Sequence, residues 1–373
     1  MKKIYAVLIS FFAVATMHAQ ENKFNLIVGT YNRTCESKGM YVYEFNSNTG
    51  DLQLKNNTEN VLNPSFLTVS KDNKFVYSVN QNANGTNSSG VSSFKYDSKS
   101  GKIDLINRQE VKAEGPCYII NDDKNVITAN YFSGSISVFG KNNDGSITEM
   151  KQQVQHLGKS IHPKNQLSAH AHMAAFSPDH KYVLVSDLGN DKVYSYQYNP
   201  NSATDVLQFK DTVVVKSGSG PRHFTFSKDG KFVYLIQELD GTLTSFSYSD
   251  GKLSKLNETS VVAPDFKGEP SAADIHISAD GKFLYASNRT TANDISVFKI
   301  LKKGKLEFIQ RTSTLGNGPR NFTIDPTDKF LLVGNQNSND IVIFKRDSKT
   351  GKLTDTGKKV ELCSPVCLVF TKI

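Results

Sequence analysis

Arginine and glutamate side chains recur at matching places in the second half of the chain. Arg222 follows a Gly-Pro pair in "GPRHFTFSKDGKFVYLIQEL", and Glu238 ends this stretch sixteen residues later. Arg320 and Gln336 have the same spacing in "GPRNFTIDPTDKFLLVGNQ". A guanidinium presents a planar fork of donors that suits a carboxylate, a phosphate or a developing oxyanion. A glutamate among arginines stays ionised and can orient or deprotonate water.

The same spacing brings further polar residues into a candidate site. His172 lies sixteen residues before Leu188, which follows Asp187, and Asp274 lies fifteen residues before Arg289. We expect one site that contains His172, Asp187, Arg222, His223, Glu238, Asp274, Asn288, Arg289, Arg320 and Gln336. Such a set predicts hydrolysis of an ester or lactone, with Glu238 or His172 as the base and with Arg222 and Arg289 on the carbonyl oxygen.

A repeat of about fifty residues must position these side chains. Each copy has a small residue or Pro, a run in which apolar and polar residues alternate, a Ser/Asp-rich turn, and a second such run that ends in polar residues. The copies begin near Pro64, Pro116, His170, Pro221, Pro270, Pro319 and Pro365. Two more alternating runs follow in each full copy, so every repeat has four antiparallel strands. Four strands repeated at this period predict an all-β fold, a seven-bladed β-propeller.

The two ends of the chain together predict the seventh blade. The last copy, "SPVCLVFTKI", supplies only an inner strand, and "FNLIVGTYN", "GMYVYEFN" and "DLQLKNN" supply the other three. In a blade, the first strand begins where the second ends, close to the central axis. The ten candidate residues should therefore lie at one mouth of the central channel, on four consecutive blades.

The four cysteines leave two alternatives open. Cys35 and Cys363 should lie on the same rim of the shared blade, where a disulfide would lock the ring. Four free buried thiols are the other alternative, and they are slightly favoured because Cys367 competes as a partner and Cys117 has no evident mate.

The N-terminus predicts export. Residues 1–19 have two lysines, a short apolar run and a small-residue cleavage site, which is typical of a secretory signal peptide rather than of a membrane span. Residues 20–373 should form the propeller domain. The net charge of +8 is spread over turns along the whole chain, so no nucleic-acid partner is expected. The sequence gives no prediction of the oligomeric state.

No cofactor or metal is predicted. The stretch from His156 to His172 is rich in histidine, but no cysteine accompanies it and part of it reads as a loop. Neither a Gly-x-Ser-x-Gly elbow nor a phosphate-binding glycine loop is present in the sequence.

From "HMAAFSPD" to "GPRNFTIDPTDKFLLVGNQ", the ordered series of His, Gly-Pro-Arg-His, Glu and Asn-Arg-Thr resembles the seven-bladed lactonase family. That family includes bacterial 6-phosphogluconolactonases and fungal 3-carboxy-cis,cis-muconate lactonizing enzymes. The resemblance covers the whole mature chain and implies that His172, Arg222, Glu238 and Arg289 form the active site. It also implies a small-molecule lactone or carboxylate as the substrate. The expected substrate is a 6-phosphogluconolactone-like lactone or an unphosphorylated sugar lactone; the second is suggested by the signal peptide, because phosphogluconolactone is cytoplasmic.

Two other functions remain open at this point. A cycloisomerase would use the same arginines to hold the carboxylates of a muconate while it closes a lactone. A propeller without turnover would use the mouth of the channel to bind a ligand or a protein.

Overall fold

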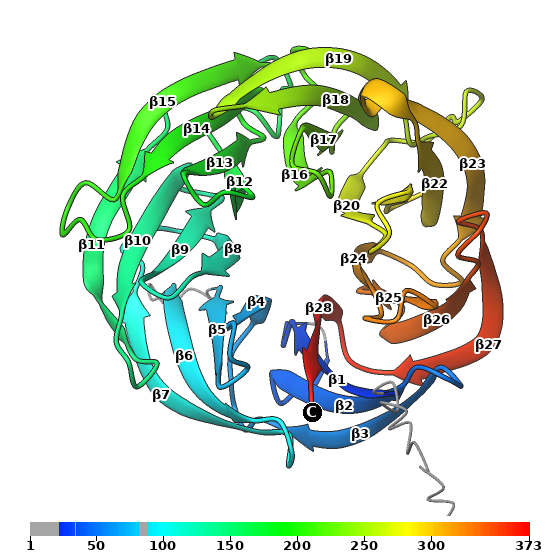
Figure 1. The fold of residues 1–373 in the computed structure, drawn as a ribbon, viewed down its shortest axis with the longest axis horizontal. Coiled ribbons are helices and arrows are strands. Elements are labelled where there is room, and N and C mark those ends of the chain that lie inside the picture. Colours follow the sequence, from blue (N-terminus) through cyan, green and yellow to red (C-terminus); the bar gives the residue numbers. More distant parts are fainter. Residues whose placement is uncertain (1–21, 34, 82–88) are drawn as a thin grey trace, which may run out of the picture.

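A computed structural model describes residues 22–33, 35–81 and 89–373 of the chain. In this part of the chain, seven four-stranded antiparallel sheets surround a central axis as blades (Figure 1). The predicted all-β, seven-bladed propeller is confirmed, and the helix assigned within the described ranges is a three-residue 3-10 turn, Lys302–Gly304. The predicted signal peptide at residues 1–19 lies outside the described residues.

The strands of each blade run from the axis outward. The first three full blades are β4 (Pro64–Val69), β5 (Phe75–Asn80), β6 (Gly90–Asp97), β7 (Lys102–Glu110); β8 (Pro116–Asn121), β9 (Asn125–Asn130), β10 (Ser135–Lys141), β11 (Ile147–Gln155); and β12 (Ala171–Phe176), β13 (Tyr182–Asp187), β14 (Lys192–Tyr198), β15 (Leu207–Val214). The next three are β16 (Pro221–Phe226), β17 (Phe232–Gln237), β18 (Thr242–Ser249), β19 (Lys252–Ser260); β20 (Ala272–Ile277), β21 (Phe283–Asn288), β22 (Asp294–Ile300), β23 (Leu306–Ser313); and β24 (Pro319–Ile324), β25 (Phe330–Asn335), β26 (Asp340–Arg346), β27 (Leu353–Glu361). The shared blade is β28 (Pro365–Lys372), β1 (Lys23–Thr30), β2 (Met40–Asn46), β3 (Asp51–Asn57).

The shared blade closes the ring as predicted. The C-terminal strand β28 is innermost and pairs antiparallel with β1, with Ile27 opposite Val369. Figure 1 shows the red C-terminal strand beside the blue N-terminal strands. Cys35 and Cys363 are joined by a disulfide at this closure, so the favoured alternative of four free thiols is wrong for this pair. Cys117 and Cys367 are free and buried.

The Ser/Asp-rich turns of the repeat join the inner strand of each blade to the second strand. In the first such turn, the Ser70 hydroxyl donates to Asp72 (2.6 Å) and accepts from the Phe75 backbone N–H (3.0 Å). The same serine arrangement recurs at Ser177, Ser227 and Ser278. In five of the six turns that join an inner strand to the next strand in sequence, one residue has a positive φ, which Gly, Asn and Asp tolerate better than most residues. These positions hold Asn73, His180, Gly230, Gly281 and Asp328.

Side chains of the inner strands tie neighbouring blades together around the channel. Near its start, each inner strand has a bulge against its partner strand, as between Pro319 and Asn321. Four backbone N–H groups just after such bulges donate to a side chain of the preceding blade. The pairs are Leu67 with Cys367 (3.3 Å), Phe224 with Met173 (3.2 Å), Phe322 with Asp274 (3.3 Å) and Leu368 with Asn321 (2.7 Å).

The hydrophobic core consists of separate layers between the faces of adjacent blades. Between the blades β12–β15 and β16–β19, for example, Leu184, Val193, Phe224, Leu235 and Phe246 pack together. Burial of each such side chain contributes about 1.5 to 3 kcal/mol, so these layers hold the inner strands rigidly. Among the residues that the structure describes, no helix has the length and apolar character needed to cross a membrane.

Candidate active site

A cavity of about 200 Å³ opens at the mouth of the channel where the inner strands begin. Every one of the seven blades contributes to its wall. The residues that line it are Tyr31, Arg33, Gln81, Gly115, Cys117, Tyr131, Phe132, His172, Glu238, Arg289 and Arg320. Four of the ten predicted site residues, His172, Glu238, Arg289 and Arg320, are therefore brought together here.

Glu238 lies between two guanidinium groups. It directly follows β17, and its Oε2 is 2.7 Å from Nε of Arg222 on β16. Its Oε1 is 2.9 Å from Nη2 of Arg289, which directly follows β21. Arg222 is buried and also donates to the backbone carbonyl of Ala273, so it lies behind Glu238 and does not line the cavity. Arg289 donates through Nε to the carbonyl of Ser271 (3.2 Å), which holds its guanidinium at the cavity wall.

The positive charges keep Glu238 ionised. Burial on its own would raise the pKa of the Glu238 carboxyl, but Arg289, Arg222 and Arg320 outweigh it and lower the pKa below its usual value of 4.5. Burial, followed by repulsion from Arg289, lowers the pKa of Arg222 to about 10, which still leaves it charged at neutral pH. The site therefore combines one carboxylate with a surplus of positive charge.

His172 contributes a neutral imidazole to the cavity. Its ring packs edge-to-face against Tyr131 (centroids 5.4 Å apart) and His223 (5.3 Å). Burial, and then the charge of Arg222, lower the pKa of His172 well below its ordinary value. Its Nδ1 is buried and has no hydrogen-bond partner among the described residues. The ring is thus neutral at physiological pH, with hydrogen-bonding capacity that the protein does not use.

His223 and Asp274 lie behind the cavity wall rather than in it. His223 Nδ1 is 2.8 Å from Asp274 Oδ1, and His276 Nε2 is 2.9 Å from Asp274 Oδ2. Burial, and then the charge of Arg222, lower the pKa of His223 to about 4. Burial would raise the pKa of Asp274, but the two imidazoles and the accompanying hydrogen bonds hold it below its usual range. This network joins neighbouring inner strands and fixes the ring against which His172 packs.

Asp187, Asn288 and Gln336 also lie outside the cavity lining. Asp187 is buried, and its carboxylate meets the His156 ring (2.7 Å) and the backbone N–H groups of His170 (2.7 Å) and Gly189 (3.0 Å). Asn288 accepts from the backbone N–H of Ser271 (2.8 Å), and Gln336 donates its backbone N–H to Gly318 (2.8 Å). For Asp187 and Asn288, these contacts fix the start of an inner strand against the end of the second strand.

Sequence reasoning missed Tyr31, Arg33 and Phe132 on one side of the cavity. Tyr31 directly follows β1, the second strand of its blade, and thus occupies the position of Glu238 and Arg289 in their blades. Alignment of "GTYN" with "IQEL" would have found it. Arg33 lies farther along an irregular connection, where no repeat pattern applies.

The histidines before β12 have partners within the protein. The two ring nitrogens of His156 contact Asp187 (2.7 Å) and the hydroxyl of Tyr196 (2.8 Å). His170 Nδ1 lies 2.8 Å from the carbonyl of Tyr131. Over the described ranges, no three His, Cys, Asp or Glu residues are grouped so that they could hold a metal ion.

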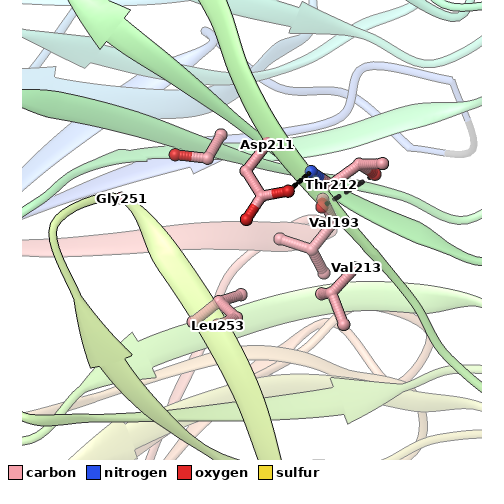
Figure 2. A pocket seen from close by; sticks show the side chains of 7 residues that line it. Val193, Asp211, Thr212, Val213, Gly251 and Leu253 are labelled. Carbon is pink, nitrogen blue, oxygen red and sulfur yellow. Dashed lines mark hydrogen bonds between the residues drawn. The ribbon is translucent and has the colours of Figure 1, made fainter.

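A second hollow lies far from the channel and is too small for a substrate. It lies between β14, β15 and the start of β19, beside Val193, Asp211 and Leu253 (Figure 2). Its volume of about 10 Å³ has room for about one water molecule. The cavity at the mouth of the channel is therefore a better candidate than this hollow.

Comparison with known proteins agrees with the fold. A family model described as "Lactonase, 7-bladed beta-propeller" matches residues 25–370. A 6-phosphogluconolactonase of Formosa agariphila is 38% identical over 333 residues, which are 88% of this chain and 94% of the relative. A 6-phosphogluconolactonase of Bacillus subtilis is 34% identical, over 92% of this chain and 97% of the relative. The structure of a periplasmic gluconolactonase from Pseudomonas aeruginosa superposes with a TM-score of 0.90 at 34% identity and covers 94% of this chain and 99% of that one.

Proposed function

The chain belongs to the seven-bladed β-propeller lactonase family, and we propose that it is a carboxylic-ester hydrolase that opens the ring ester of a sugar lactone to the aldonic acid. The observation that supports this most strongly is an ionised glutamate held at a cavity wall beside two arginines that also face the cavity. Relatives that align over nearly the whole chain are named as lactonases of this substrate class.

Glu238 acts as the general base in this proposal. It is the one carboxylate among the residues that line the cavity, and its lowered pKa keeps it ionised. It takes a proton from a water molecule while the water oxygen adds to the acyl carbon of the lactone. The tetrahedral intermediate then breaks the bond between the acyl carbon and the ring oxygen, and Glu238 returns the proton to the ring oxygen, which leaves as a hydroxyl. The product acid ionises at neutral pH, so each turnover releases one proton to the solution.

Arg289 and Arg320 stabilise the oxyanion that forms on the carbonyl oxygen. Both line the cavity, and their guanidinium groups are charged donors of the kind that oxyanion sites use. Arg222, which the sequence suggested for this role, lies behind Glu238 and fixes its orientation. His172 is neutral and has hydrogen-bonding capacity to spare, so it binds a hydroxyl of the substrate or the attacking water.

The arginines supply the positive charge that a metal ion would supply in a metal-dependent hydrolase, so the proposed reaction requires no metal. We also propose that the protein is exported, on the basis of the signal peptide at residues 1–19 and of the periplasmic gluconolactonase that superposes on it. Glucono-δ-lactone is therefore the first substrate to test.

Proton release by the mature protein tests the proposal, with glucono-δ-lactone and 6-phosphogluconolactone as substrates and with EDTA present. The spontaneous opening rate is subtracted. We expect a rate well above background that EDTA does not reduce. A rate that disappears with EDTA and returns with a divalent metal would overturn metal independence. No rate on either lactone, together with cyclisation of a carboxymuconate, would favour the cycloisomerase instead.

A further inference from the structure

One side of the cavity is formed by a group of residues that we call the cationic wall: Tyr31, Arg33, Gln81 and Arg320. Arg33 Cζ lies 4.9 Å from the centre of the Tyr31 ring, and Arg320 Cζ lies 5.6 Å from the same centre. Arg33 Nη2 also donates to Gln81 Oε1 (3.0 Å). Two guanidinium groups packed on one aromatic ring are held at the cavity, where their positive charge attracts an anion. The wall thus suits a carboxylate or a phosphate ester on the substrate.

Two residues of the wall, Tyr31 and Arg33, lie on the irregular connection between β1 and β2. Tyr31 donates its backbone N–H to the carbonyl of Ser364 (3.1 Å). On either side of Arg33, the connection is anchored at Asn32, whose backbone N–H donates to Asn63 Oδ1 (2.8 Å), and at Ser37, whose hydroxyl lies 2.6 Å from that of Thr30.

The disulfide ties down the middle of this connection. Cys35 lies between the two anchors, two residues beyond Arg33, and its partner Cys363 directly precedes Ser364. The β27–β28 connection therefore holds Tyr31 through a hydrogen bond and holds the stretch with Arg33 through a covalent bond. Loss of the covalent bond would give Arg33 more conformational freedom while the anchors of Tyr31 remain.

The bridge is also accessible to small reagents. Cys35 and Cys363 are half-buried and line a surface cavity of about 400 Å³ together with Ser338, Asn339 and Leu362, among others. In contrast, burial raises the pKa values of the free thiols Cys117 and Cys367 to about 12, so they form little thiolate. A dithiol reductant in solution can therefore reach the bridge, and the two buried thiols form little thiolate that could exchange with it.

We propose that the Cys35–Cys363 disulfide positions Arg33 in the cationic wall, so that its reduction weakens the binding of an anionic lactone and leaves the chemistry at Glu238 and Arg320 intact. This inference rests on the proposed function, because it assigns the wall to substrate binding in the same cavity. Dithiothreitol transfers two electrons and two protons to the bridge, yields two cysteine thiols and becomes a cyclic disulfide. An oxidising compartment re-forms the bridge.

The test compares three forms of the full mature chain: oxidised, reduced with dithiothreitol, and Cys35→Ser/Cys363→Ser. KM and kcat are measured with 6-phosphogluconolactone at a temperature where all three forms remain folded. We expect KM to rise about tenfold in the reduced and variant forms, the loss expected when a charge-assisted hydrogen bond is weakened, with kcat within about twofold. Reoxidation restores KM in the wild type and not in the variant.

A second variant separates positioning from stability. Arg33→Ala should itself raise KM and should remove most of the additional effect of reduction, because the group that the bridge positions is then missing. Cys367→Ser is the matched control: it changes a buried cysteine outside the cavity lining and should leave both KM and the response to dithiothreitol unchanged.

Unchanged KM values together with a lower melting temperature of the reduced protein would overturn the inference, because the bridge would then only close the ring. A loss confined to kcat would overturn it as well. If the oxidised wild type hydrolyses neither lactone, the proposed function fails, and calorimetry with 6-phosphogluconate still decides the inference. Binding that is about tenfold weaker after reduction supports it, whereas equal binding or no binding in both forms overturns it.

Discussion

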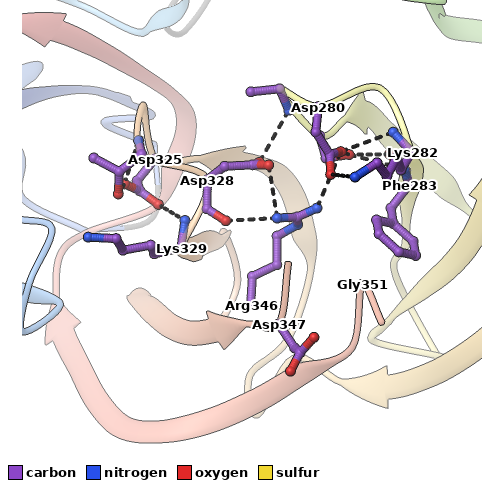
Figure 3. A network of polar contacts seen from close by, with 12 residues as sticks. Asp280, Lys282, Phe283, Asp325, Asp328, Lys329, Arg346, Asp347 and Gly351 are labelled. Carbon is purple, nitrogen blue, oxygen red and sulfur yellow. Dashed lines mark hydrogen bonds and ion pairs between the residues drawn. The ribbon is translucent and has the colours of Figure 1, made fainter. Parts of the chain in front are cut away.

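Two arginine–carboxylate clusters lie at opposite ends of the blades, and they use similar groups in different ways. The first is Glu238 between Arg222 and Arg289. The second is Arg346 at the end of β26 with Asp280 and Asp328, which lie in turns between the inner and second strands (Figure 3). In the antiparallel blades, these turns are at the end of the channel opposite the cavity.

In the second cluster, Arg346 uses Nε and Nη1 in contacts within the protein, whereas its Nη2 has no hydrogen-bond partner among the described residues. Arg346 is fully buried, and it donates through Nε to the hydroxyl of Tyr285 (2.7 Å) and through Nη1 to the carbonyl of Asp328 (2.8 Å). Its Nη1 is also 2.9 Å from Asp328 Oδ2, and its Nη2 is 3.8 Å from Asp280 Oδ1. Each of these contacts joins the blade β20–β23 to the blade β24–β27 or fixes a turn, which indicates a structural role.

Asp328 of the second cluster and Glu238 of the first have pKa values shifted in opposite directions. Burial raises the pKa of Asp328 above its usual value, and the single guanidinium of Arg346 does not offset it. Burial would raise the pKa of Asp280 as well, but hydrogen bonds, with that from Ser278 first, and the charge of Arg346 lower it. In the first cluster, burial is outweighed by Arg289, Arg222 and Arg320, so the pKa of Glu238 is lowered. An ion pair is therefore not by itself a sign of catalysis. The surplus of positive charge and the adjoining cavity distinguish the site at Glu238 from the structural cluster.

The largest expected effect concerns Glu238→Gln. This change removes the proposed base and keeps the size of the side chain, so kcat/KM for a sugar lactone should fall about a thousandfold, within the range for general-base catalysis. Steady-state kinetics at matched concentrations of folded protein measures it. Asp240→Asn is the control, because Asp240 lies two residues away and contacts exposed Lys216 (3.1 Å). Similar losses in both variants would mean that the turn, and not the base, had been damaged.

Arg346→Met should lower the stability of the protein and leave its activity unchanged. Removal of the guanidinium leaves two carboxylates without their partner and should cost about 3 kcal/mol in the free energy of unfolding. Urea denaturation measures this cost, and kcat per folded molecule should remain at the wild-type value. The control is Lys102→Met, which breaks an exposed contact of 2.9 Å with Asp104 and should cost less than about 1 kcal/mol. A loss of kcat in Arg346→Met would remove the distinction between the two clusters.

Asp294 is a buried carboxylate with still fewer hydrogen-bond and charge partners. Its Oδ1 is buried without a hydrogen-bond partner in the described residues, and Arg311 Nε lies 3.6 Å from its Oδ2. Burial raises its pKa to about 6. The folded state therefore binds this proton more tightly than the unfolded state does. The stabilisation from the protonated carboxyl is lost as the pH rises through about 6. Asp294→Asn should therefore stabilise the protein at pH 8, by about 2 kcal/mol relative to its effect at pH 4. Equal effects of the substitution at the two pH values in urea unfolding would contradict the assignment.

The smallest expected effect is that of pH on kcat/KM. Glu238 works as a base only when ionised, and its pKa lies below 4.5. The value of kcat/KM should therefore be level from pH 8 to pH 5 and should decline only as the pH falls through the lowered pKa of Glu238. Initial-rate assays corrected for spontaneous opening measure this profile. A decline centred near pH 6.5 would instead indicate a histidine with an ordinary pKa.

Much of the fold followed from the sequence because its repeat specifies geometry. The Ser/Asp-rich turns and the alternating strands fix which residues begin the inner strand and end the second one. Arg222 and Glu238 were therefore placed together correctly. Sequence spacing gave no information on the depth of each side chain, so it did not show that Arg222 lies behind Glu238 or that His223 and Asp274 face each other behind the wall.

The missed residues lie where the repeat pattern ends. Arg33 and Cys35 belong to an irregular connection whose path is set by contacts with distant residues such as Asn63 and Cys363. The rim shared by Cys35 and Cys363 could be predicted from blade closure, but the choice between a bridge and free thiols required their positions in space.

A single-turnover reaction in H₂¹⁸O tests the role of Glu238 most directly. The protein, in excess over glucono-δ-lactone, is digested after the reaction, and the peptide with Glu238 and the product acid are both analysed by mass spectrometry. If Glu238 is a general base, the product acid contains one ¹⁸O atom in its carboxylate and Glu238 contains none. The product acid also forms faster than in the spontaneous reaction. Label in the Glu238 carboxylate would show a covalent acyl-enzyme and contradict the account, as would a rate no faster than spontaneous opening.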